Sequence, residues 1–423
     1  MRSAYLAVLR IPHARPLLLA SLVGRLSFAT GPLGLVLFVQ DATGSFAQAG
    51  AASAAIALTS GLLAPVKGRL VDRYGQGRCL PPLAAVFATA MAGVVAVARP
   101  GPGPAGVAAT VGLAAVAGAA APPLGPSMRV LWLSLVGPGP RLQTAYALDA
   151  VLDELLFVAG PLLVAGLATV LDPAAGPLAT AGLALAGTLG FVASPVSRSQ
   201  AGGLGPAERG TGWAGALGRP GMRTLALSLA GVGAAIGIWE IGLVGAARQA
   251  GAPEAAGLLL AAWAAASAVG GLWYGSRSWR RPPGQRYLAL LALLAAACAP
   301  MAATGSPLAL GAVVALVGLV LAPLESSAYV LAAELAPPGT LTESGTWLTT
   351  AVNVTAAAGV AVAGALVDRA GVAPTLVVAW ACTALGLLVA LAGRDHLGAA
   401  PYRGKHELRQ ATTRQLRRER RIL

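Results

Sequence analysis

Charged residues are scarce in this sequence of 423 residues: they make up 11% of it, whereas soluble globular proteins carry about 25%. Aromatic residues contribute only 5%, so a soluble fold would lack the large side chains that usually fill a core. Hydrophobic residues make up 56%, and glycine alone supplies 55 residues. Small residues let helices approach closely in a bilayer, so this composition indicates an integral membrane protein.

Cysteine and histidine are equally rare. Cys79, Cys298 and Cys382 lie far apart, which predicts neither a disulfide framework nor a zinc site. The three histidines fall outside the apolar segments, so no Ser-His pair or metal cluster can be assembled within them. No GxxxxGK[ST] phosphate-binding loop occurs either. We therefore expect no enzymatic activity, no cofactor and no metal.

The formal net charge of +14 raises the question of a nucleic-acid partner. Such binding requires basic residues gathered on one soluble face. Here the arginines lie mostly between apolar runs and in the C-terminal tail. We therefore expect a lipid bilayer, and no nucleic acid, as the surroundings of this chain.

Apolar windows of about 20 residues, the length that crosses a bilayer, recur along the whole chain. They predict an all-α membrane protein with twelve spanning helices. The helices are expected at about 17–40, 47–70, 79–98, 105–126, 143–170, 174–194, 222–247, 253–275, 286–304, 307–333, 344–367 and 372–393.

A polar segment rich in Gly, Pro and Arg divides these helices into two sets of six. The expected organisation is an N-terminal segment, a six-helix bundle, a linker, a second six-helix bundle and a basic tail, at residues 1–16, 17–194, 195–221, 222–393 and 394–423. The tail is either a solvated topology anchor or a helix on an anionic membrane surface.

The loop cations predict the orientation, because Lys and Arg accumulate on the cytoplasmic side. Of the 30 cationic residues, only Arg99, Arg248 and Arg369 fall on the side opposite the N-terminus, and Arg25 lies inside the first helix. Both termini are therefore expected in the cytoplasm of a bacterium, with the chain in its inner membrane.

The string GRLVDRYGQGR follows the second predicted helix and carries Gly68, Asp72, Arg73, Gly75 and Arg78. Glycine permits close helix contact and tight turns, and an aspartate favours a helix N-terminus or an arginine. The spacing resembles the signature loop of the major facilitator superfamily. That resemblance implies two six-helix halves around a central cavity, alternating access, a cytoplasmic latch at this loop, and a monomer.

A degenerate second copy follows the eighth predicted helix in GGLWYGSRSWRR. It keeps Gly271, Gly275 and Arg277 but has Ser276 where the acidic residue is expected. A further GALVDRAG string follows the eleventh helix, on the outer side in the predicted topology, where a purely structural turn is the favoured interpretation. The segment ELAPPGTLTESGTW before the eleventh helix resembles one found in poorly characterised bacterial members of the superfamily.

The fifth helix contains Gly160 and Pro161, which resemble the glycine-proline motif of antiporter branches. The pair either hinges and seals the outer half of the bundle or serves ordinary helix packing. The fourth helix, as predicted at 105–126, contains no arginine, unlike many proton-driven drug exporters. This difference argues against a specific assignment as a proton antiporter.

Ionisable residues inside apolar spans are the strongest candidates for function, because a charge in the membrane is costly and usually faces a cavity or a partner. Asp149 and Asp153 are four residues apart on one helix face, and Glu154 points about 100° away. One face is expected to meet Arg25 and the other the cavity. The full set is Arg25, Asp149, Asp153, Glu154, Glu240 and Glu325.

Three of these acids, Glu154, Glu240 and Glu325, are candidates for carrying a proton or binding a cationic solute. The alternative for each is a structural ion pair or hydrogen bond. Aromatic residues in or near the spans serve as cavity walls or, by default, as interfacial anchors. They are Trp239, Trp263, Trp273, Tyr274, Tyr329, Trp347 and Trp380.

These observations together favour a secondary transporter that moves a small solute by alternating access, with protons as a candidate coupling ion. Few polar residues lie within the spans, which favours export of amphiphilic or drug-like compounds. Uptake of a metabolite is the near alternative. A non-transporting membrane receptor or scaffold with the same fold is the other.

Overall fold

The computed structural model describes residues 2–98, 104–200, 215–253, 255–304 and 306–398. Over these ranges the chain forms helices and no strands. Arg99, residues 201–214 of the predicted linker and the tail from residue 399 lie outside the described residues.

Twelve segments of the described chain are long and apolar enough to cross a membrane, which confirms the predicted number. The first six form the N-terminal half. They are α2 (Ala14–Thr43), α3 (Phe46–Tyr74), α4 (Gln76–Ala98), the pair α5 (Pro104–Ala120) and α6 (Leu124–Val136), α7 (Pro140–Val170) and α8 (Ala175–Ala193).

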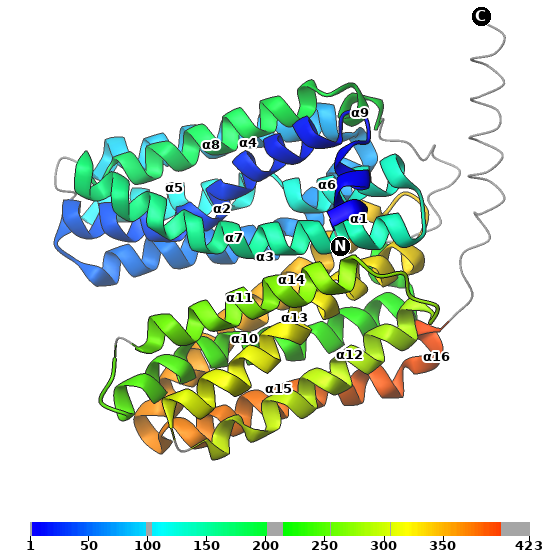
Figure 1. Cartoon of the computed structure of the whole chain (residues 1–423). Coiled ribbons are helices and arrows are strands. Elements are labelled where there is room, and N and C mark those ends of the chain that lie inside the picture. The colour runs from blue at the N-terminus through cyan, green and yellow to red at the C-terminus, as the bar shows by residue number, and fades with distance from the viewer. Residues whose placement is uncertain (1, 99–103, 201–214, 254, 305, 399–423) are drawn as a thin grey trace, which may run out of the picture.

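The other six form the C-terminal half, which lies beside the first as a second bundle (Figure 1). They are α10 (Pro220–Gln249), α11 (Ala255–Gly275), α12 (Pro283–Cys298) with η3 (Ala299–Ala303), α13 (Pro307–Leu335), α14 (Leu341–Ala370) and α15 (Val372–Ala392). Short elements complete the described chain: α1 (Arg2–Leu9), α9 (Pro195–Ser199), η2 (Gly215–Gly218) and α16 (Arg394–Leu397).

Small residues bring the helices of each half together. A Cβ atom on Gly187 of α8 would lie 2.1 Å from the backbone nitrogen of Gly24 in α2. In the other half, a Cβ atom on Gly237 of α10 would lie 1.9 Å from the carbonyl oxygen of Ala356 in α14. Only glycine fits such backbone contacts, so the high glycine content serves helix packing here.

The fourth span corrects the sequence prediction. It was expected to end at residue 126, but it runs over Ala105–Val136, with a break between α5 and α6 at Pro122 and Pro123. Proline lacks the backbone N–H that would continue the helix, which accounts for the break. The helix resumes at Leu124, and Arg129, which the prediction assigned to a loop, lies inside the bundle. The fourth span therefore contains an arginine, and the argument against a proton antiporter that rested on its absence no longer holds.

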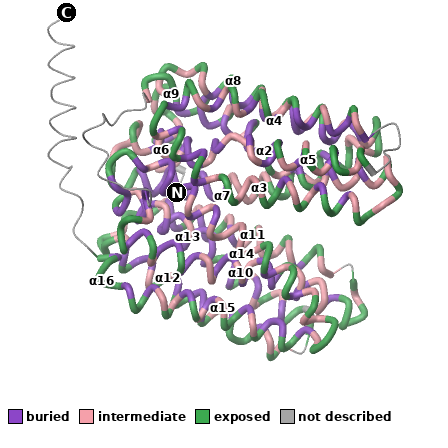
Figure 2. The backbone as a smooth tube through the Cα atoms, turned by 180° about the vertical axis from the view of Figure 1, so that it is seen from behind, coloured by how far each residue is buried: buried purple, intermediate pink, exposed green. Residues whose placement is uncertain are grey.

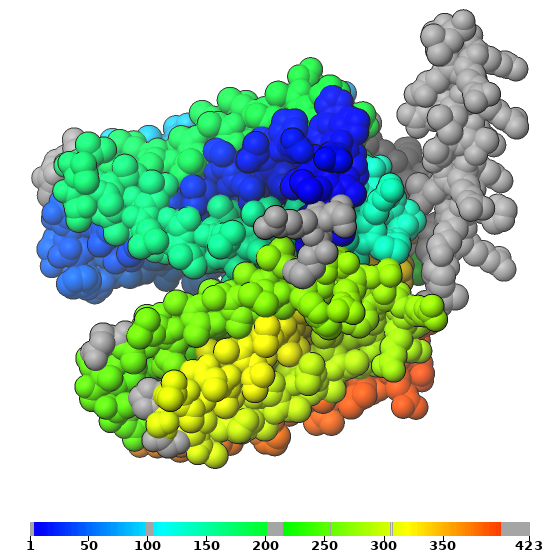
Figure 3. All heavy atoms as spheres, in the orientation of Figure 1, coloured from blue at the N-terminus to red at the C-terminus, as the bar shows by residue number. Residues whose placement is uncertain are grey.

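The halves meet at one end of the molecule, the end that holds α1 and α16, called here the termini-side end. Figure 3 shows them in contact at this end and a hollow between them at the opposite end. Figure 2 shows buried residues where the halves meet, around α6 and α13. Contacts between the halves join α3 to α14 and α7 to α11 and α13.

Candidate functional site

Four charged side chains from three helices of the N-terminal half form one network, called here the charge cluster. Arg25 of α2 donates to Asp149 of α7, with Nη1 to Oδ1 at 2.7 Å, and also pairs with Asp153. Arg129 of α6 places Nε 3.2 Å from Asp149 Oδ2 and Nη2 3.1 Å from Asp153 Oδ2. The expected shared face of the two aspartates therefore meets Arg25, and it meets Arg129 as well.

The charge cluster is electrically balanced, with two guanidinium groups and two carboxylates. Balance is required here, because leaving a buried charge without its partner costs several kcal/mol. The side chains of Asp149, Arg25 and Arg129 are 0%, 7% and 11% exposed, whereas that of Asp153 is 30% exposed. Asp153 is therefore the member of the cluster that is most open to its surroundings.

Arg129 also contacts the C-terminal half. Its Cζ atom lies 3.6 Å from the centre of the Tyr329 ring of α13, a cation–π contact across the two halves. The Tyr329 hydroxyl lies 3.2 Å from Thr349 Oγ1 of α14. Tyr329 was expected by default to be an interfacial anchor, and the structure instead places it against a buried arginine.

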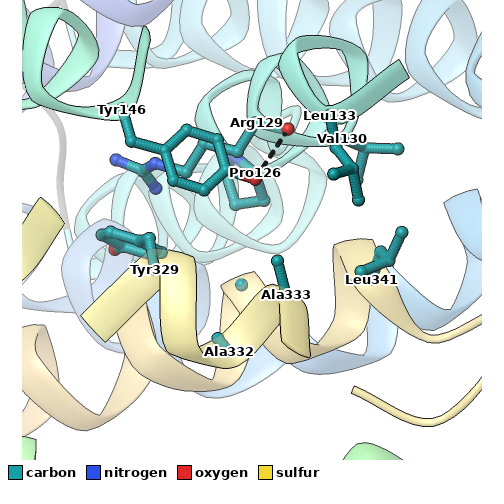
Figure 4. A pocket seen from close by; sticks show the side chains of 10 residues that line it. Pro126, Arg129, Val130, Leu133, Tyr146, Tyr329, Ala332, Ala333 and Leu341 are labelled. Atoms are coloured by element: carbon teal, nitrogen blue, oxygen red, sulfur yellow. Dashed lines mark hydrogen bonds between the residues drawn. The ribbon is translucent and has the colours of Figure 1, made fainter. Parts of the chain in front are cut away.

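A small pocket opens beside this contact, between α6 and α7 on one side and α13 and α14 on the other (Figure 4). Arg129, Tyr146 and Tyr329 lie at one edge of it. The Tyr146 hydroxyl donates to the carbonyl oxygen of Arg129 at 3.0 Å, which fixes the backbone of α6. The remaining lining is apolar, mostly alanine and leucine together with Pro126.

Two further acids of the predicted set lie next to the charge cluster, from opposite halves. Glu154 of α7 accepts a hydrogen bond from Ser267 of α11 at 3.0 Å, which joins the two halves. Glu325 of α13 lies within electrostatic range of Glu154, Asp153 and Arg129. The structure does not bring Glu240 into this group: it is exposed on α10.

The predicted latch lies at the termini-side end, where α3 meets the start of α14. The carboxylate of Asp72 accepts the backbone N–H groups of Thr342 at 3.0 Å and Glu343 at 2.8 Å. A Cβ atom on Gly68 would lie 2.5 Å from Thr346 Oγ1 and 2.9 Å from the Cα of Glu343. Asp72 therefore caps a helix of the other half, and glycine at position 68 is what lets the two helices approach.

The other latch residues differ in their surroundings. Gly75 has φ 89° just after the last residue of α3, a conformation that favours glycine. Arg73 and Arg78 are exposed, and the guanidinium of Arg73 lies over the ring of its neighbour Tyr74, 5.0 Å from the centroid.

Sequence reasoning missed an ion pair at the latch. Glu343, with a side chain 2% exposed, binds Arg69 through Oε1 at 2.7 Å and Oε2 at 3.2 Å. Its Oε1 also accepts the backbone N–H of Ala216, at 3.1 Å, in the described part of the linker. One carboxylate therefore connects α3, α14 and the linker.

The degenerate second copy uses reversed hydrogen-bond chemistry. Gln143 and Thr144, at the start of α7, donate to carbonyl oxygens at the end of α11, those of Tyr274 at 3.1 Å and Gly275 at 2.6 Å. Ser276, which replaces the expected acid, bonds within its own segment at 2.8 Å. Here side chains at a helix N-terminus donate hydrogen bonds to backbone carbonyl oxygens. At the latch, by contrast, a side-chain carboxylate accepts hydrogen bonds from backbone N–H groups.

The glycines of this second contact again allow close approach. A Cβ atom on Gly275 would lie 2.3 Å from the Cβ of Ala147, and one on Gly271 would lie 2.8 Å from Val151 Cγ2. The Tyr5 hydroxyl of α1 donates to the carbonyl oxygen of Leu272 at 2.6 Å, so the N-terminal helix also joins the halves.

A buried arginine supports the same region. Arg286 of α12, 8% exposed, donates to the Gln143 side-chain oxygen and, at 3.0 Å, to the Tyr274 hydroxyl. Gln143 therefore links three helices, α7, α11 and α12. Position 286 was expected at the first residue of a span, and nothing in the sequence distinguished this arginine from a loop cation.

Gly160 of the glycine-proline pair in α7 lies in close contact with α2. A Cβ atom on Gly160 would lie 2.6 Å from the Cβ of Ala29 in α2. Pro161 stands inside the helix, which continues to Val170. One turn nearer the charge cluster, Phe28 and Phe157 make an edge-to-face contact with ring centres 6.2 Å apart.

The comparisons with known proteins agree with this architecture. The model of the Major Facilitator Superfamily matches residues 17–345. No curated protein matches the sequence.

Three solved structures share the fold at low sequence identity. A bacterial homologue of the iron transporter ferroportin in an outward-facing state has a TM-score of 0.75 and 14% identity, covering 90% of this chain and 99% of its own. The human organic anion transporter MFSD10 has a TM-score of 0.67 and 18% identity, covering 90% of this chain and 98% of its own. The E. coli fucose:proton symporter FucP has a TM-score of 0.68 and 14% identity, covering 91% of this chain and 99% of its own. Because the family model covers well over half of the chain and the twelve-helix fold agrees with it, the protein belongs to the Major Facilitator Superfamily.

Proposed function

We propose that this protein is a secondary active transporter that exports small amphiphilic or drug-like compounds by alternating access, driven by protons. The observation that carries the proposal is the position of Glu154 and Glu325. These two acids come from opposite halves and lie beside a balanced charge cluster, between halves that are in contact at one end and hollowed at the other (Figure 3).

The proposed orientation places the termini-side end in the cytoplasm of a bacterial inner membrane. The structure moves Arg129 from a loop into a helix, and Lys67, within the second span, is buried and donates to the Gly118 carbonyl oxygen at 3.0 Å. Most other cations still flank the spans on this side, so the asymmetry that supports the orientation remains. In this orientation the hollow faces outward.

Alternating access requires contacts that can be broken at one end and formed at the other. The described contacts at the termini-side end are hydrogen bonds, the ion pair of Arg69 with Glu343, one cation–π contact and close glycine contacts. Asp72, Gly68 and the reversed contact at Gln143 are the proposed parts of this closure, with the protein acting as a monomer. Gly160 and Pro161 are the proposed hinge of the outer half.

The proton role is assigned to Glu154 and Glu325, because the charge cluster leaves no excess cation to neutralise both. Within the cluster, Arg25, Asp149 and Asp153 balance one another together with Arg129. An acid without a full counter-charge favours taking up a proton in a low-dielectric site. Glu240, exposed and apart from this group, is the weaker candidate for a solute contact.

The amphiphilic solute class follows from the walls near the site. The pocket is lined by apolar residues apart from Arg129, Tyr146 and Tyr329, and the Phe28 and Phe157 rings contact each other about one turn from the charge cluster. The names of the three similar structures give iron, organic anions and fucose as solutes, so likeness of fold favours no one solute.

The test is transport in sealed vesicles of defined orientation, using a mixed panel of amphiphilic drugs and metabolites with and without a proton gradient. Wild type is compared with Glu154→Gln and with Asp368→Asn, a matched loss of one carboxylate at an exposed position of α14. We expect gradient-dependent export that is lost in Glu154→Gln and kept in Asp368→Asn.

Other outcomes separate the alternatives. Gradient-driven movement in the opposite direction would favour a metabolite importer. Equal transport by wild type and Glu154→Gln would remove Glu154 from the proton pathway. If wild type moves no compound of a broad panel in either direction, the receptor or scaffold is favoured.

A further inference from the structure

Arg129 is the one residue of the charge cluster that the structure places in contact with both halves. The edge of its guanidinium pairs with two carboxylates of α7, with Nε 3.2 Å from Asp149 Oδ2 and Nη2 3.1 Å from Asp153 Oδ2. The face of the same group lies over the Tyr329 ring of α13, 3.6 Å from its centre. A planar guanidinium offers both surfaces at once, which an ammonium group does not.

Arg25 differs in this respect. Both of its ion-pair partners, Asp149 and Asp153, belong to its own half. Its described ion pairs therefore lie within the N-terminal half. A change in the pairing of Arg129 also alters a contact on which the closure at the termini-side end depends.

Asp153 is placed to start such a change. Its side chain is 30% exposed, whereas that of Asp149 is fully buried. It also lies within electrostatic range of Glu325, so it faces the C-terminal half. Glu325 and Tyr329 are four residues apart and share the face of α13 that meets the charge cluster.

We propose that Arg129 couples the charge state of Asp153 to closure of the termini-side end, through its contact with Tyr329. A positive charge that neutralises Asp153 removes one of the two carboxylates that orient the guanidinium. The guanidinium then turns on its remaining partner, Asp149, and leaves the Tyr329 ring. The inference rests on the proposed transport function and names its coupling residue.

The other charged and titratable groups around this pair limit the effect. Arg25 and Asp149 stay paired in the N-terminal half, and the Tyr146 hydroxyl holds the backbone of α6 rather than the guanidinium. Glu154 and Glu325 add negative charge nearby, so a proton or a cationic solute is drawn to this place. Either would supply the positive charge.

The test measures shape rather than transport. A cysteine at Ala333, which lines the pocket beside Tyr329, reports on opening through its rate of alkylation by a maleimide. The three native cysteines are replaced by alanine or serine in the purified full chain. Loss of a cation–π contact worth about 0.5 to 2 kcal/mol predicts a twofold to thirtyfold faster alkylation in Tyr329→Leu.

The matched variants define the coupling. Tyr329→Phe keeps the ring and is expected to behave as wild type, whereas Tyr287→Leu removes a tyrosine buried within the C-terminal half, bonded to Ser228 at 2.6 Å, and controls for general loosening. Asp153→Asn is expected to accelerate alkylation in wild type but to add nothing in Tyr329→Leu. Arg129→Lys keeps the charge but lacks the planar face, so its alkylation rate is expected to match that of Tyr329→Leu. It replaces Tyr329→Leu in the test if Tyr329→Leu does not fold.

Two arms distinguish the source of charge: lowering the pH, and adding tetraphenylphosphonium at constant pH. Faster alkylation in either arm, absent in Asp153→Asn, supports the proposal and names the source. Three outcomes would each overturn the proposal. The effects of Asp153→Asn and Tyr329→Leu on the alkylation rate could be additive, or Tyr329→Leu and Tyr329→Phe could have equal effects. The third is that wild type responds in neither arm. Because alkylation requires no solute movement, its outcome is independent of the vesicle result.

Discussion

Asp72 in α3 caps the N-terminus of α14 in the opposite half, accepting the backbone N–H of Glu343 at 2.8 Å. The local cap residue of α14, Thr340, makes no side-chain cap hydrogen bond of its own. The first turn of α14 therefore depends on a carboxylate from the other bundle. Separation of the halves exposes amide groups that have no intrahelical partner.

Asp72→Asn is expected to favour opening at the termini-side end. An amide has one acceptor oxygen and no charge, so it replaces two charge-assisted hydrogen bonds with one neutral bond at most. The difference predicts about tenfold faster alkylation of a cysteine at Ala333. Asp368→Asn is the control, and an unchanged rate in Asp72→Asn would remove Asp72 from the closure.

Gly68→Ala is also expected to favour opening at the termini-side end, by steric overlap rather than by loss of a charge. The new Cβ atom would lie 2.9 Å from the Cα of Glu343, a backbone atom that cannot rotate away. Overpacking of this kind costs about 1 to 3 kcal/mol, which predicts alkylation at least fivefold faster. Gly77→Ala is the matched control, since a Cβ there meets nothing within 4 Å. Equal rates in the two variants would contradict the prediction.

Gln143→Leu is expected to lower the thermal stability of the purified protein. It removes the donor to the Tyr274 carbonyl oxygen and one acceptor of the buried Arg286, a loss of about 1 to 3 kcal/mol. Gln143→Glu restores an acceptor for Arg286 and should fall between Leu and wild type. Thermal unfolding in detergent measures the order, and equal midpoints for Leu and Glu would argue against a role of Arg286 in this contact.

Tyr5→Phe is expected to lower stability by about 1 kcal/mol, because it removes the hydrogen bond to the Leu272 carbonyl oxygen. Burial raises the pKa of Tyr5 to about 12. Its pKa in the unfolded chain is about 10, so the stabilising effect is complete below that pH and is lost only as pH rises through about 12.

The difference between wild type and Tyr5→Phe should therefore be constant between pH 6 and 9. Unfolding by denaturant at several pH values measures it. Tyr74→Phe, at an exposed tyrosine, is the control. A difference that changes within this pH range would mean that another group sets the contact of α1 with α11.

Hydropathy predicted the number and order of the spans because lipid imposes one simple rule on all of them. It misplaced the end of the fourth span, which it put at residue 126 although the span continues to Val136. Arg129 was then assigned to a loop, since an arginine at the end of an apolar run has the same sequence signature whether it meets water or two aspartates. Only its partners in α7 distinguish the cases.

The candidate site was predictable where partners share one helix face and not where they come from another half. The spacing of Asp149 and Asp153 indicated a common partner such as Arg25. Tyr329 and Ser267 lie far from the cluster in sequence, and neither residue type marks such a contact. Helix packing alone determines which of many tyrosines and serines reaches it.

The distribution of the charge cluster along the chain has a consequence for biosynthesis. Arg25 lies in the first spanning helix, and its partner Asp149 is made 124 residues later. A lone arginine at the centre of a span costs about 2.5 to 3.5 kcal/mol on insertion scales. We therefore expect the first helix to reach its final depth in the bilayer only after α7 has been made, so that the N-terminal half is completed as an assembly of helices.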